Sequence, residues 1–250
     1  MIQQQNGPEV HLDQQRINQD HLQKNPVERE KGRVKVEFYT DPLCCWSWAF
    51  EKPWRQLLTG YGDKISYRYV MCGMIRDWQS YDDAMNAVSR PLQMGPVWMH
   101  ASEMTQVKMR YDVWHLNPPS SSYPACIAVK TAGLQSDELA DQYLYAIRVS
   151  LMEEAADISR HDVLLSIART IPSLDFARFE NDWNRGLGKN AFRYDLQQAR
   201  YHGISRFPTL TFTNGKNEGF MIVGYRPFEA LQQAFENILA ESSAELNAKC

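Results

Sequence analysis

Residues 38–51 read FYTDPLCCWSWAFE, and this stretch indicates how the rest of the chain folds. Leading into it, apolar residues at positions 34, 36 and 38 alternate with the residues between them, which is the period-two pattern of a β-strand. After it, a run with helical spacing continues to Gly60 and Gly62, which predicts one helix of about three turns. The Asp-Pro pair at 41–42 breaks the strand and turns the chain. Cys44 is therefore expected where a strand passes into a helix.

That position matters for the chemistry of a thiol. The unpaired N–H groups and the positive end of the helix dipole favour the thiolate, and a helix N-terminus can lower a cysteine pKa from about 8.5 to roughly 3.5–7.5. The sequence thus predicts that Cys44 is an ionised nucleophile.

The segment Asp41–Trp48 resembles the active-site segment of the DsbA-like branch of the thioredoxin superfamily, whose members carry Asp-Pro-x-Cys-x-x-Cys at the start of their first helix. On that pattern Cys44 matches the attacking cysteine, and Cys45 and Trp46 match the two intervening residues. Ser47 stands where the family has its second, resolving cysteine. The resemblance implies thiol–disulfide exchange, and Ser47 argues against the ordinary dithiol form of it.

Composition sets the outer limits. The chain has 250 residues, 44% hydrophobic and 23% charged, which is typical of a soluble globular protein with a large core. A net charge of -3 gives no electrostatic case for nucleic acid or an anionic membrane, and no apolar run is long enough to span a membrane. Five cysteines without regular spacing do not form a disulfide framework, and no secretory signal is visible. We therefore expect a reducing, cytoplasmic compartment, with no nucleic-acid or membrane partner.

The order of elements predicts a discontinuous domain. Residues 1–32 are Gln-rich and are expected to form a mobile N-terminal arm. Residues 33–75 read as strand, helix, strand, with the second strand over 64–74 and parallel to the first. Cys72 on that strand, and Cys126 further on, are expected to be buried core residues.

Residues 76–202 change to a helical pattern and are predicted to form an inserted domain. Break signals separate the helices, among them Arg90-Pro91 and Gly186-Leu187-Gly188. The expected helices are Tyr81–Ser89, Val97–Thr105, Ser122–Ala132, Asp137–Met152, His161–Thr170, Asp175–Asn184 and Asn190–Tyr201.

The C-terminal part, residues 203–241, returns to strands and a helix. Thr209–Thr213 is followed by Asn214-Gly215, a two-residue turn signal, and then by a second strand over 220–223, which predicts an antiparallel hairpin. Pro227 suits the first turn of a final helix, after which 242–250 is expected to be a tail. The whole pattern predicts an α/β thioredoxin fold with a large helical insertion between its two halves, 33–75 and 203–241, and this is also the DsbA-like arrangement.

A second match lies far from the first. Gly203–Leu210 is similar to the segment that precedes the hairpin strand in thioredoxin-like proteins, where the proline peptide bond is cis and faces the active-site cysteine. The resemblance implies that the Phe207–Pro208 bond is cis and that the Phe207 backbone lies beside Cys44, where an extended substrate can pair with it. Trp46, Phe207 and Pro208 are accordingly the expected substrate-binding residues.

These residues together favour a thiol–disulfide oxidoreductase or isomerase that works through one cysteine. Cys44 would attack a protein or small-molecule disulfide, and an external thiol such as glutathione, used as a co-substrate, would resolve the intermediate. Ser47 can donate a hydrogen bond to the Cys44 thiolate. Cys45 is a bystander, a slow resolver or a spare nucleophile, since neighbouring Cα atoms lie about 3.8 Å apart and ordinary disulfides need about 4.4–6.8 Å. Cys250 on the tail is a less favoured resolving thiol.

Two other readings stay open. Trp46-Ser47-Trp48 is similar to the end of the active-site segment of kappa-class glutathione transferases, which activate the glutathione thiol and form no disulfide. Some cytoplasmic DsbA-like proteins are instead adaptors that deliver clients to the ClpXP protease, and their Asp-Pro-Leu-Cys segment is like residues 41–44. A client-binding surface for such an adaptor would be aromatic, using Trp46, Trp48, Trp54, Tyr123 and Phe207.

The sequence carries no motif for metal binding, nucleotide hydrolysis or serine-hydrolase chemistry. The six histidines are scattered and none has metal-site spacing from a cysteine pair. The chain has no glycine-rich phosphate loop and no Gly-x-Ser-x-Gly elbow. We expect no metal and no tightly bound cofactor, and the sequence does not predict an oligomeric state.

Overall fold

The computed structural model describes residues 33–215 and 218–247, so the predictions for the arm 1–32 and for Cys250 lie outside the described residues. The elements, in chain order, are β1 (Val34–Thr40), α3 (Cys45–Ala49), α4 (Glu51–Tyr61), the 3-10 turn η1 (Gly62–Lys64), β2 (Ile65–Met71), α5 (Pro91–Thr105), α6 (Val113–Leu116), α7 (Tyr123–Gly133), α8 (Asp137–Met152), α9 (His161–Arg169), α10 (Phe176–Asn184), α11 (Leu187–Tyr201), β3 (Thr209–Thr213), β4 (Gly219–Val223) and α12 (Phe228–Asn247).

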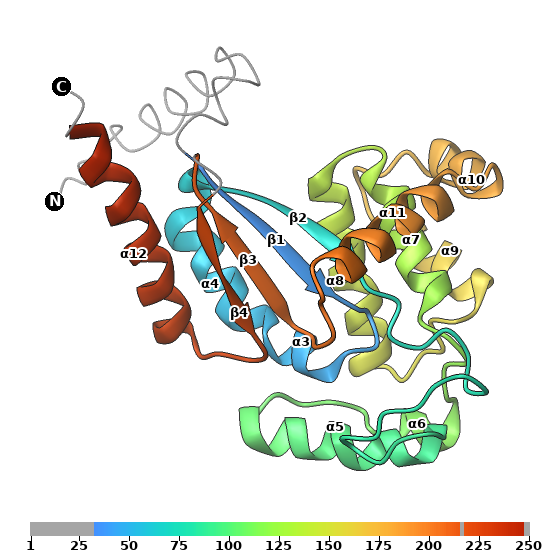
Figure 1. Ribbon diagram of the computed structural model, residues 1–250. Helices are drawn as coiled ribbons and strands as arrows, with labels where there is room; N and C mark the ends of the chain where they lie inside the picture. The colour runs from blue at the N-terminus through green and yellow to red at the C-terminus, as the bar shows by residue number, and fades with distance from the viewer. Residues whose placement is uncertain (1–32, 216–217, 248–250) are drawn as a thin grey trace, which may run out of the picture.

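A four-stranded sheet in the order β2-β1-β3-β4 holds the two halves of the chain together (Figure 1). Strand β1 pairs in parallel with β2, so the crossover predicted from the sequence is confirmed. On its other side β1 pairs antiparallel with β3, with Tyr39 opposite Thr209. Strands β3 and β4 form the expected antiparallel hairpin. Because β1 and β3 are antiparallel neighbours, the segment that follows β1 and the segment that precedes β3 lie side by side at the same end of these strands.

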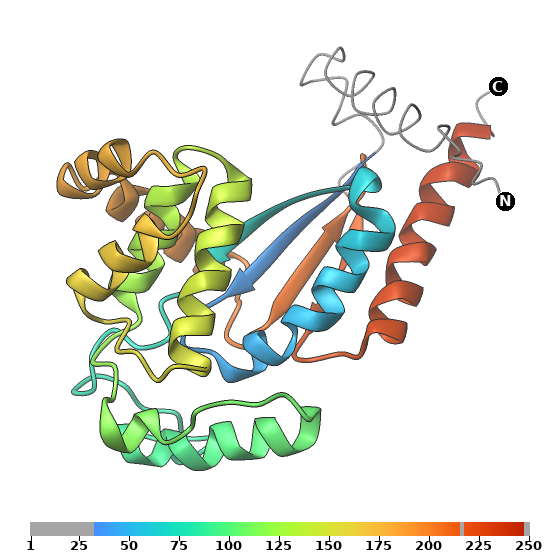
Figure 2. The same ribbon diagram turned by 180° about the vertical axis from the view of Figure 1, so that it is seen from behind.

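The core lies on both faces of this sheet. On one face, Phe38 of β1 packs edge-on against Trp54 of α4, with ring centroids 5.6 Å apart, in the same cluster as Phe212 and Phe235. Helices α4 and α12 cover this face (Figure 2). Full burial of a large apolar side chain contributes about 1.5–3 kcal/mol, so these side chains fix the layer. On the other face, Tyr39 of β1 packs in a second buried cluster that includes a residue of α11.

The insertion between β2 and β3 forms two groups of helices. Helices α7, α8, α9, α10 and α11 gather beside the β2 edge of the sheet, and α5 and α6 form a separate layer beyond α3, as both views show (Figures 1 and 2). The structure is thus the expected thioredoxin fold with a helical insertion.

The first helix is split, which the sequence did not predict. Helix α3 ends at Ala49 and α4 begins at Glu51, with Phe50 between them. Pro53 lies in the first turn of α4 and has no N–H to donate to the Ala49 carbonyl, so the hydrogen-bond ladder cannot run through this point.

Strand β2 is shorter than the predicted strand 64–74, because it ends at Met71. Beyond it, Gly73 has a positive φ of 62°. The N–H groups of Met74 and Ile75 donate to the side chains of Asp41 and Ser122 instead of to a neighbouring strand. These side-chain acceptors replace the ladder and turn the chain away from the sheet.

The predicted helix Tyr81–Ser89 is wrong. The Asp83 carboxylate accepts hydrogen bonds from the backbone N–H groups of Met85 and Asn86, and Ala87 has a positive φ of 53°. Asp83 and Val88 form an isolated antiparallel bridge. A short acidic side chain that captures nearby backbone donors favours a turn over a helix.

Two helices begin earlier than predicted, because a residue read as a break belongs to the helix. Helix α5 starts at Pro91, since proline is well suited to the first helical position, and the Gln93 side chain accepts from the N–H of Arg90. Helix α11 starts at Leu187, and Gly188 allows it to approach α7 closely instead of ending it.

Two predictions about the C-terminal part also change. Residues 214–218 separate β3 from β4, so the connection is longer than the two-residue turn expected. Helix α12 continues to Asn247, past the predicted start of the tail at 242, where Ala, Glu and Leu are good helix formers.

We predict opposite effects for alanine at two helical glycines. A Cβ at position 188 would lie 2.8 Å from the carbonyl oxygen of Ile127 and overlap the Thr131 hydroxyl, so Gly188→Ala should destabilise the protein by about 1–3 kcal/mol. At Gly60 nothing lies within 4 Å, so Gly60→Ala should stabilise it by up to about 1 kcal/mol. Urea unfolding of both variants measures the difference, and equal effects would contradict the close packing of α7 and α11.

Candidate active site

The turn after β1 sets the position of Cys44. The Asp41 carboxylate accepts from the N–H of Leu43 at 2.9 Å, and the Asp41 carbonyl accepts from the N–H of Cys44 at 3.1 Å. Cys44 is the N-cap of α3, and its sulfur accepts from the N–H of Ser47 at 3.4 Å. The sequence prediction that Cys44 lies at a helix N-terminus is confirmed.

The second segment that the sequence singled out, Gly203–Leu210, lies next to the Cys44 sulfur. The Phe207–Pro208 peptide bond is cis, as the sequence predicts, and the Cys44 thiol donates to the Phe207 carbonyl over 3.6 Å. The N–H of Gly224 donates to the Pro208 carbonyl at 2.7 Å, which ties this loop to the turn after β4. The fold thus brings together two segments that are 163 residues apart in the chain.

Ser47 faces the sulfur from within the helix. Its side chain is fully buried, and its oxygen has no conventional hydrogen-bond partner among the described residues. It is therefore available to donate to a thiolate at Cys44, and both its hydroxyl and its N–H lower the pKa of that thiol. That Ser47 takes this role in a reaction stays a prediction.

The expected low pKa of Cys44 is not found. Burial raises the pKa of this thiol, because only 6% of the residue is exposed and the thiolate loses its hydration. The Ser47 donors and the Arg148 guanidinium lower it, and the Asp41 carboxyl raises it further. The net pKa lies above the ordinary value, so the cost of desolvation exceeds the combined effect of the Ser47 donors and Arg148, which favours the neutral thiol of Cys44 at pH 7.

Cys45 and Trp46 have different surroundings. Cys45 is 4% exposed in the main core cluster, and burial together with the nearby Cys44 raises its pKa well above the ordinary value. Its pKa is raised more than that of Cys44, which makes Cys45 the weaker nucleophile of the two. Trp46 is partly exposed and lies edge-on to His100 of α5, with Tyr225 on another side, at centroid distances of 6.0 and 6.4 Å. The rings of His100 and Tyr225 therefore lie beside the segment that carries Cys44.

The carboxyl group of Asp41 is a buried part of this site that the sequence did not predict. Asp41 is fully buried, and one of its oxygens accepts from the N–H of Met74, the Ser122 hydroxyl at 2.8 Å and the Cys126 thiol at 3.4 Å. Burial raises the pKa of Asp41, and these donors oppose that rise. The Asp-Pro turn signal identified the residue but gave no sign of its side-chain partners Ser122 and Cys126, which come from the insertion.

The two remaining described cysteines, Cys72 and Cys126, lie outside the segment that carries Cys44. Cys126 is buried, as expected. Cys72 follows β2 and is half-buried, so the prediction that it is a buried strand residue is wrong; its thiol donates to the Val70 carbonyl at 3.4 Å. Within the ranges that the structure describes, no three His, Cys, Asp or Glu side chains gather as a metal site. No helix there is long and apolar enough to cross a membrane.

Comparison with known proteins gives one family match. The model of the family described as Thioredoxin matches residues 38–233, which include Cys44, Ser47 and Pro208. Among curated proteins, the ClpXP adapter protein SpxH of Halalkalibacterium halodurans is 28% identical over 216 residues, covering 85% of this chain and 70% of its own length.

Solved structures resemble the chain in fold. A protein from Nitrosomonas europaea that is assigned to the protein disulfide isomerases has a TM-score of 0.70 at 20% identity, with 84% of this chain and 98% of that chain covered. The cytosolic disulfide reductase DsbM from Pseudomonas aeruginosa has a TM-score of 0.61 at 15% identity, with 86% and 99% covered. The same reductase has also been solved with GSH, with a TM-score of 0.58 at 17% identity and 85% and 99% covered.

The raised pKa of Cys44 has a measurable consequence. Because the thiolate is the reactive form, the rate of alkylation of Cys44 by iodoacetamide should rise about tenfold per pH unit through neutral pH without a plateau. Peptide mass spectrometry of the native protein, quenched at intervals, gives the rate at each cysteine, with free glutathione as the reference thiol. A plateau at or below neutral pH would show instead that the helix terminus outweighs burial.

Proposed function

The chain belongs to the thioredoxin family, and from this premise we propose that it is a thiol–disulfide oxidoreductase that acts through a single nucleophilic cysteine, Cys44. The observation that supports this most is the approach of the Cys44 sulfur to the Phe207 carbonyl, 3.6 Å away, at the open end of α3. A disulfide that binds along the Phe207 backbone would present its sulfur to Cys44.

The absence of a cysteine at position 47 sets the course of the reaction. In the first step the Cys44 thiolate attacks a disulfide R–S–S–R′, forms Cys44–S–S–R and releases R′–S⁻. In the second step a glutathione thiolate attacks the substrate sulfur of this adduct, forms G–S–S–R and releases the Cys44 thiolate. When R is glutathione, these two steps are deglutathionylation and the product is glutathione disulfide. For any other disulfide, a second glutathione thiolate attacks the glutathione sulfur of G–S–S–R, releases R–S⁻ and completes the reduction. Isomerisation takes no net electrons, because another thiolate of the protein substrate replaces glutathione in the second step and forms the new disulfide.

The groups around the sulfur suit the second step. The N–H and hydroxyl of Ser47 donate to negative charge on Cys44, which stabilises it as a leaving group. A thiol with a raised pKa is less ionised at pH 7, but its thiolate is intrinsically more nucleophilic, which partly offsets the loss. We propose the cytoplasm as the compartment, because reduced glutathione keeps thiols free there.

The nucleophile can be identified by two serine substitutions. In a glutathione-coupled disulfide assay, Cys44→Ser should lose turnover on the order of a thousandfold or more, as expected when a covalent nucleophile is removed. Cys45→Ser should keep most of it, because Cys45 packs in the main core cluster and its pKa is raised further than that of Cys44. The opposite result, with Cys45→Ser inactive and Cys44→Ser active, would mean that the wrong nucleophile has been chosen.

A second candidate function is an adaptor for the ClpXP protease. It is favoured by the curated relatives named SpxH, which align with most of the chain at 26–28% identity. In that case the partly exposed Trp46 and Phe207 would contact a client instead of a disulfide substrate. A client that stays bound to Cys44→Ala and is degraded faster by ClpXP in its presence would favour the adaptor over the oxidoreductase.

A glutathione transferase is the third outcome that the experiments separate. Conjugation of chlorodinitrobenzene to glutathione, together with calorimetric binding of glutathione to Cys44→Ser, would support it. The oxidoreductase proposal predicts no conjugation.

A further inference from the structure

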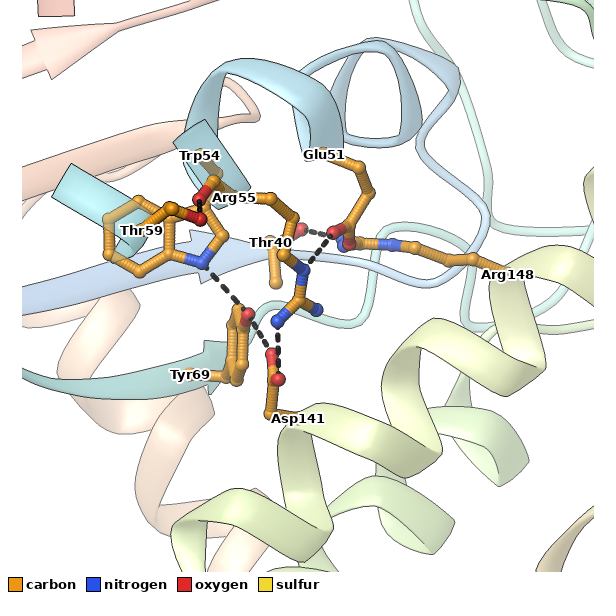
Figure 3. Close-up of polar contacts among 8 residues, drawn as sticks. All are labelled: Thr40, Glu51, Trp54, Arg55, Thr59, Tyr69, Asp141 and Arg148. Atoms are coloured by element: carbon orange, nitrogen blue, oxygen red, sulfur yellow. Dashed lines mark hydrogen bonds and ion pairs between the residues drawn. The ribbon is translucent and has the colours of Figure 1, made fainter. Parts of the chain in front are cut away.

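Arg148 of α8 is a fully buried arginine next to the active-site segment. One of its terminal nitrogens forms an ion pair with Glu51, and the other donates to the Thr40 hydroxyl (Figure 3). Its Nε has no partner among the described residues. The side chain thus reaches from the insertion into the thioredoxin-like half of the molecule.

The two partners of Arg148 lie on either side of Cys44 in the chain. Thr40 is the last residue of β1, and Glu51 is the first residue of α4. Residues 41–50 between them contain the Asp-Pro turn, Cys44 and all of α3. One guanidinium therefore holds both ends of the segment that carries the sulfur.

The polar network around Arg148 is balanced in charge. Glu51 also pairs with Arg55 at 3.2 Å, and Arg55 pairs with Asp141 of α8. The hydroxyl of Tyr69 donates to Asp141 at 2.5 Å and accepts from the Trp54 indole at 3.0 Å (Figure 3). The charges of the two arginines and two carboxylates therefore sum to zero. Of these four groups, Arg148 is the one whose charge acts on Cys44.

Among the described residues, two charged groups act most on Cys44. Arg148 from α8 favours the thiolate, and Asp41 from the turn after β1 disfavours it. Three further titratable groups interact with Cys44, namely Cys45, Cys72 and Tyr81. Their pKa values are all raised, mainly by burial, so they are neutral at pH 7. Arg148 is therefore the cation that offsets Asp41 and the loss of hydration.

We propose that Arg148 is the positioning residue of the redox site, which holds both ends of the segment bearing Cys44 and supplies the positive charge that supports its thiolate. The inference rests on the proposed function, because it assigns Arg148 a part in the same exchange reaction. It also gives the insertion a chemical role: the thioredoxin-like half contributes the sulfur, and helix α8 of the insertion contributes the charge.

A purely structural role explains the arrangement less well. Burying an ion pair is costly, and replacing one with apolar residues of similar volume is often neutral or stabilising. The unpaired Nε adds a further cost. An apolar side chain would fill the same space without these costs, so the retained charge indicates an electrostatic role.

The test measures the ionisation of Cys44 in variants of the full chain, by the pH dependence of alkylation with iodoacetamide. Arg148→Met should raise the pKa of Cys44 and lower its alkylation rate at pH 7 several-fold, about tenfold for each pKa unit. Arg148→Lys should stay closer to the wild-type rate, because it keeps the charge. Arg68→Met is the matched control: it removes an arginine paired with Glu37 on the same sheet, and it should leave Cys44 unchanged.

A second variant covers the case in which Arg148→Met does not fold, as judged by circular dichroism and thermal unfolding. Glu51→Gln removes the counter-charge and keeps Arg148, so it should lower the pKa of Cys44 and raise the alkylation rate at pH 7. A folded Arg148→Met that titrates like the wild type would overturn the inference. If Arg148→Met does not fold, the inference would be overturned by a Glu51→Gln variant whose Cys44 is alkylated at pH 7 at the wild-type rate or more slowly. The measurement needs no substrate, so a predicted shift in a protein without disulfide turnover would refute the proposed function and leave the role of Arg148 in place.

Discussion

The pairing of β1 with β3 is the constraint on which the site depends. These strands are far apart in the chain, and the register that sets Tyr39 opposite Thr209 brings the end of β1 beside the start of β3. Cys44 follows the first of these points and Pro208 precedes the second, so their approach follows from the sheet. Hydrophobic burial of Phe38 and Leu210, which also face each other in this register, holds the pairing in place. A shift of β3 by one residue would turn Leu210 to the other face of the sheet, away from Phe38.

The helical insertion contacts the segment that carries Cys44 at several points. Helix α7 holds the Asp-Pro turn through Ser122, which donates to Asp41, and α8 holds both flanks of the active-site segment through Arg148. The two buried charges act on Cys44 in opposite directions. Since burial itself disfavours the thiolate, the ionisation of the sulfur depends on how far Arg148 and the Ser47 donors offset burial and Asp41.

Local signals were enough for much of the fold and for the core of the site. The alternation in β1, the Asp-Pro turn and the resemblance around Pro208 predicted the strand, the position of Cys44 and the cis bond. Local signals failed where a residue has two uses. Pro91 begins a helix instead of interrupting one, and Gly188 allows two helices to pack closely.

The pKa of Cys44 and the partners of Asp41 could not be predicted in this way. They depend on burial and on side chains that arrive from the insertion, and neither leaves a pattern in the neighbouring sequence. The same holds for Arg148, which sits in a helix whose bounds the sequence predicted correctly but whose buried arginine carries no local signal.

The central claim is that Cys44 exchanges disulfides alone, without a second cysteine. Incubation of the reduced protein with glutathione disulfide, followed by rapid acid quenching and peptide mass spectrometry, tests this directly. The account predicts one glutathione per chain, attached to Cys44, with Cys45, Cys72 and Cys126 still reduced. An internal disulfide between Cys44 and another cysteine, or a protein in which Cys44 remains free while another cysteine is modified, would contradict it.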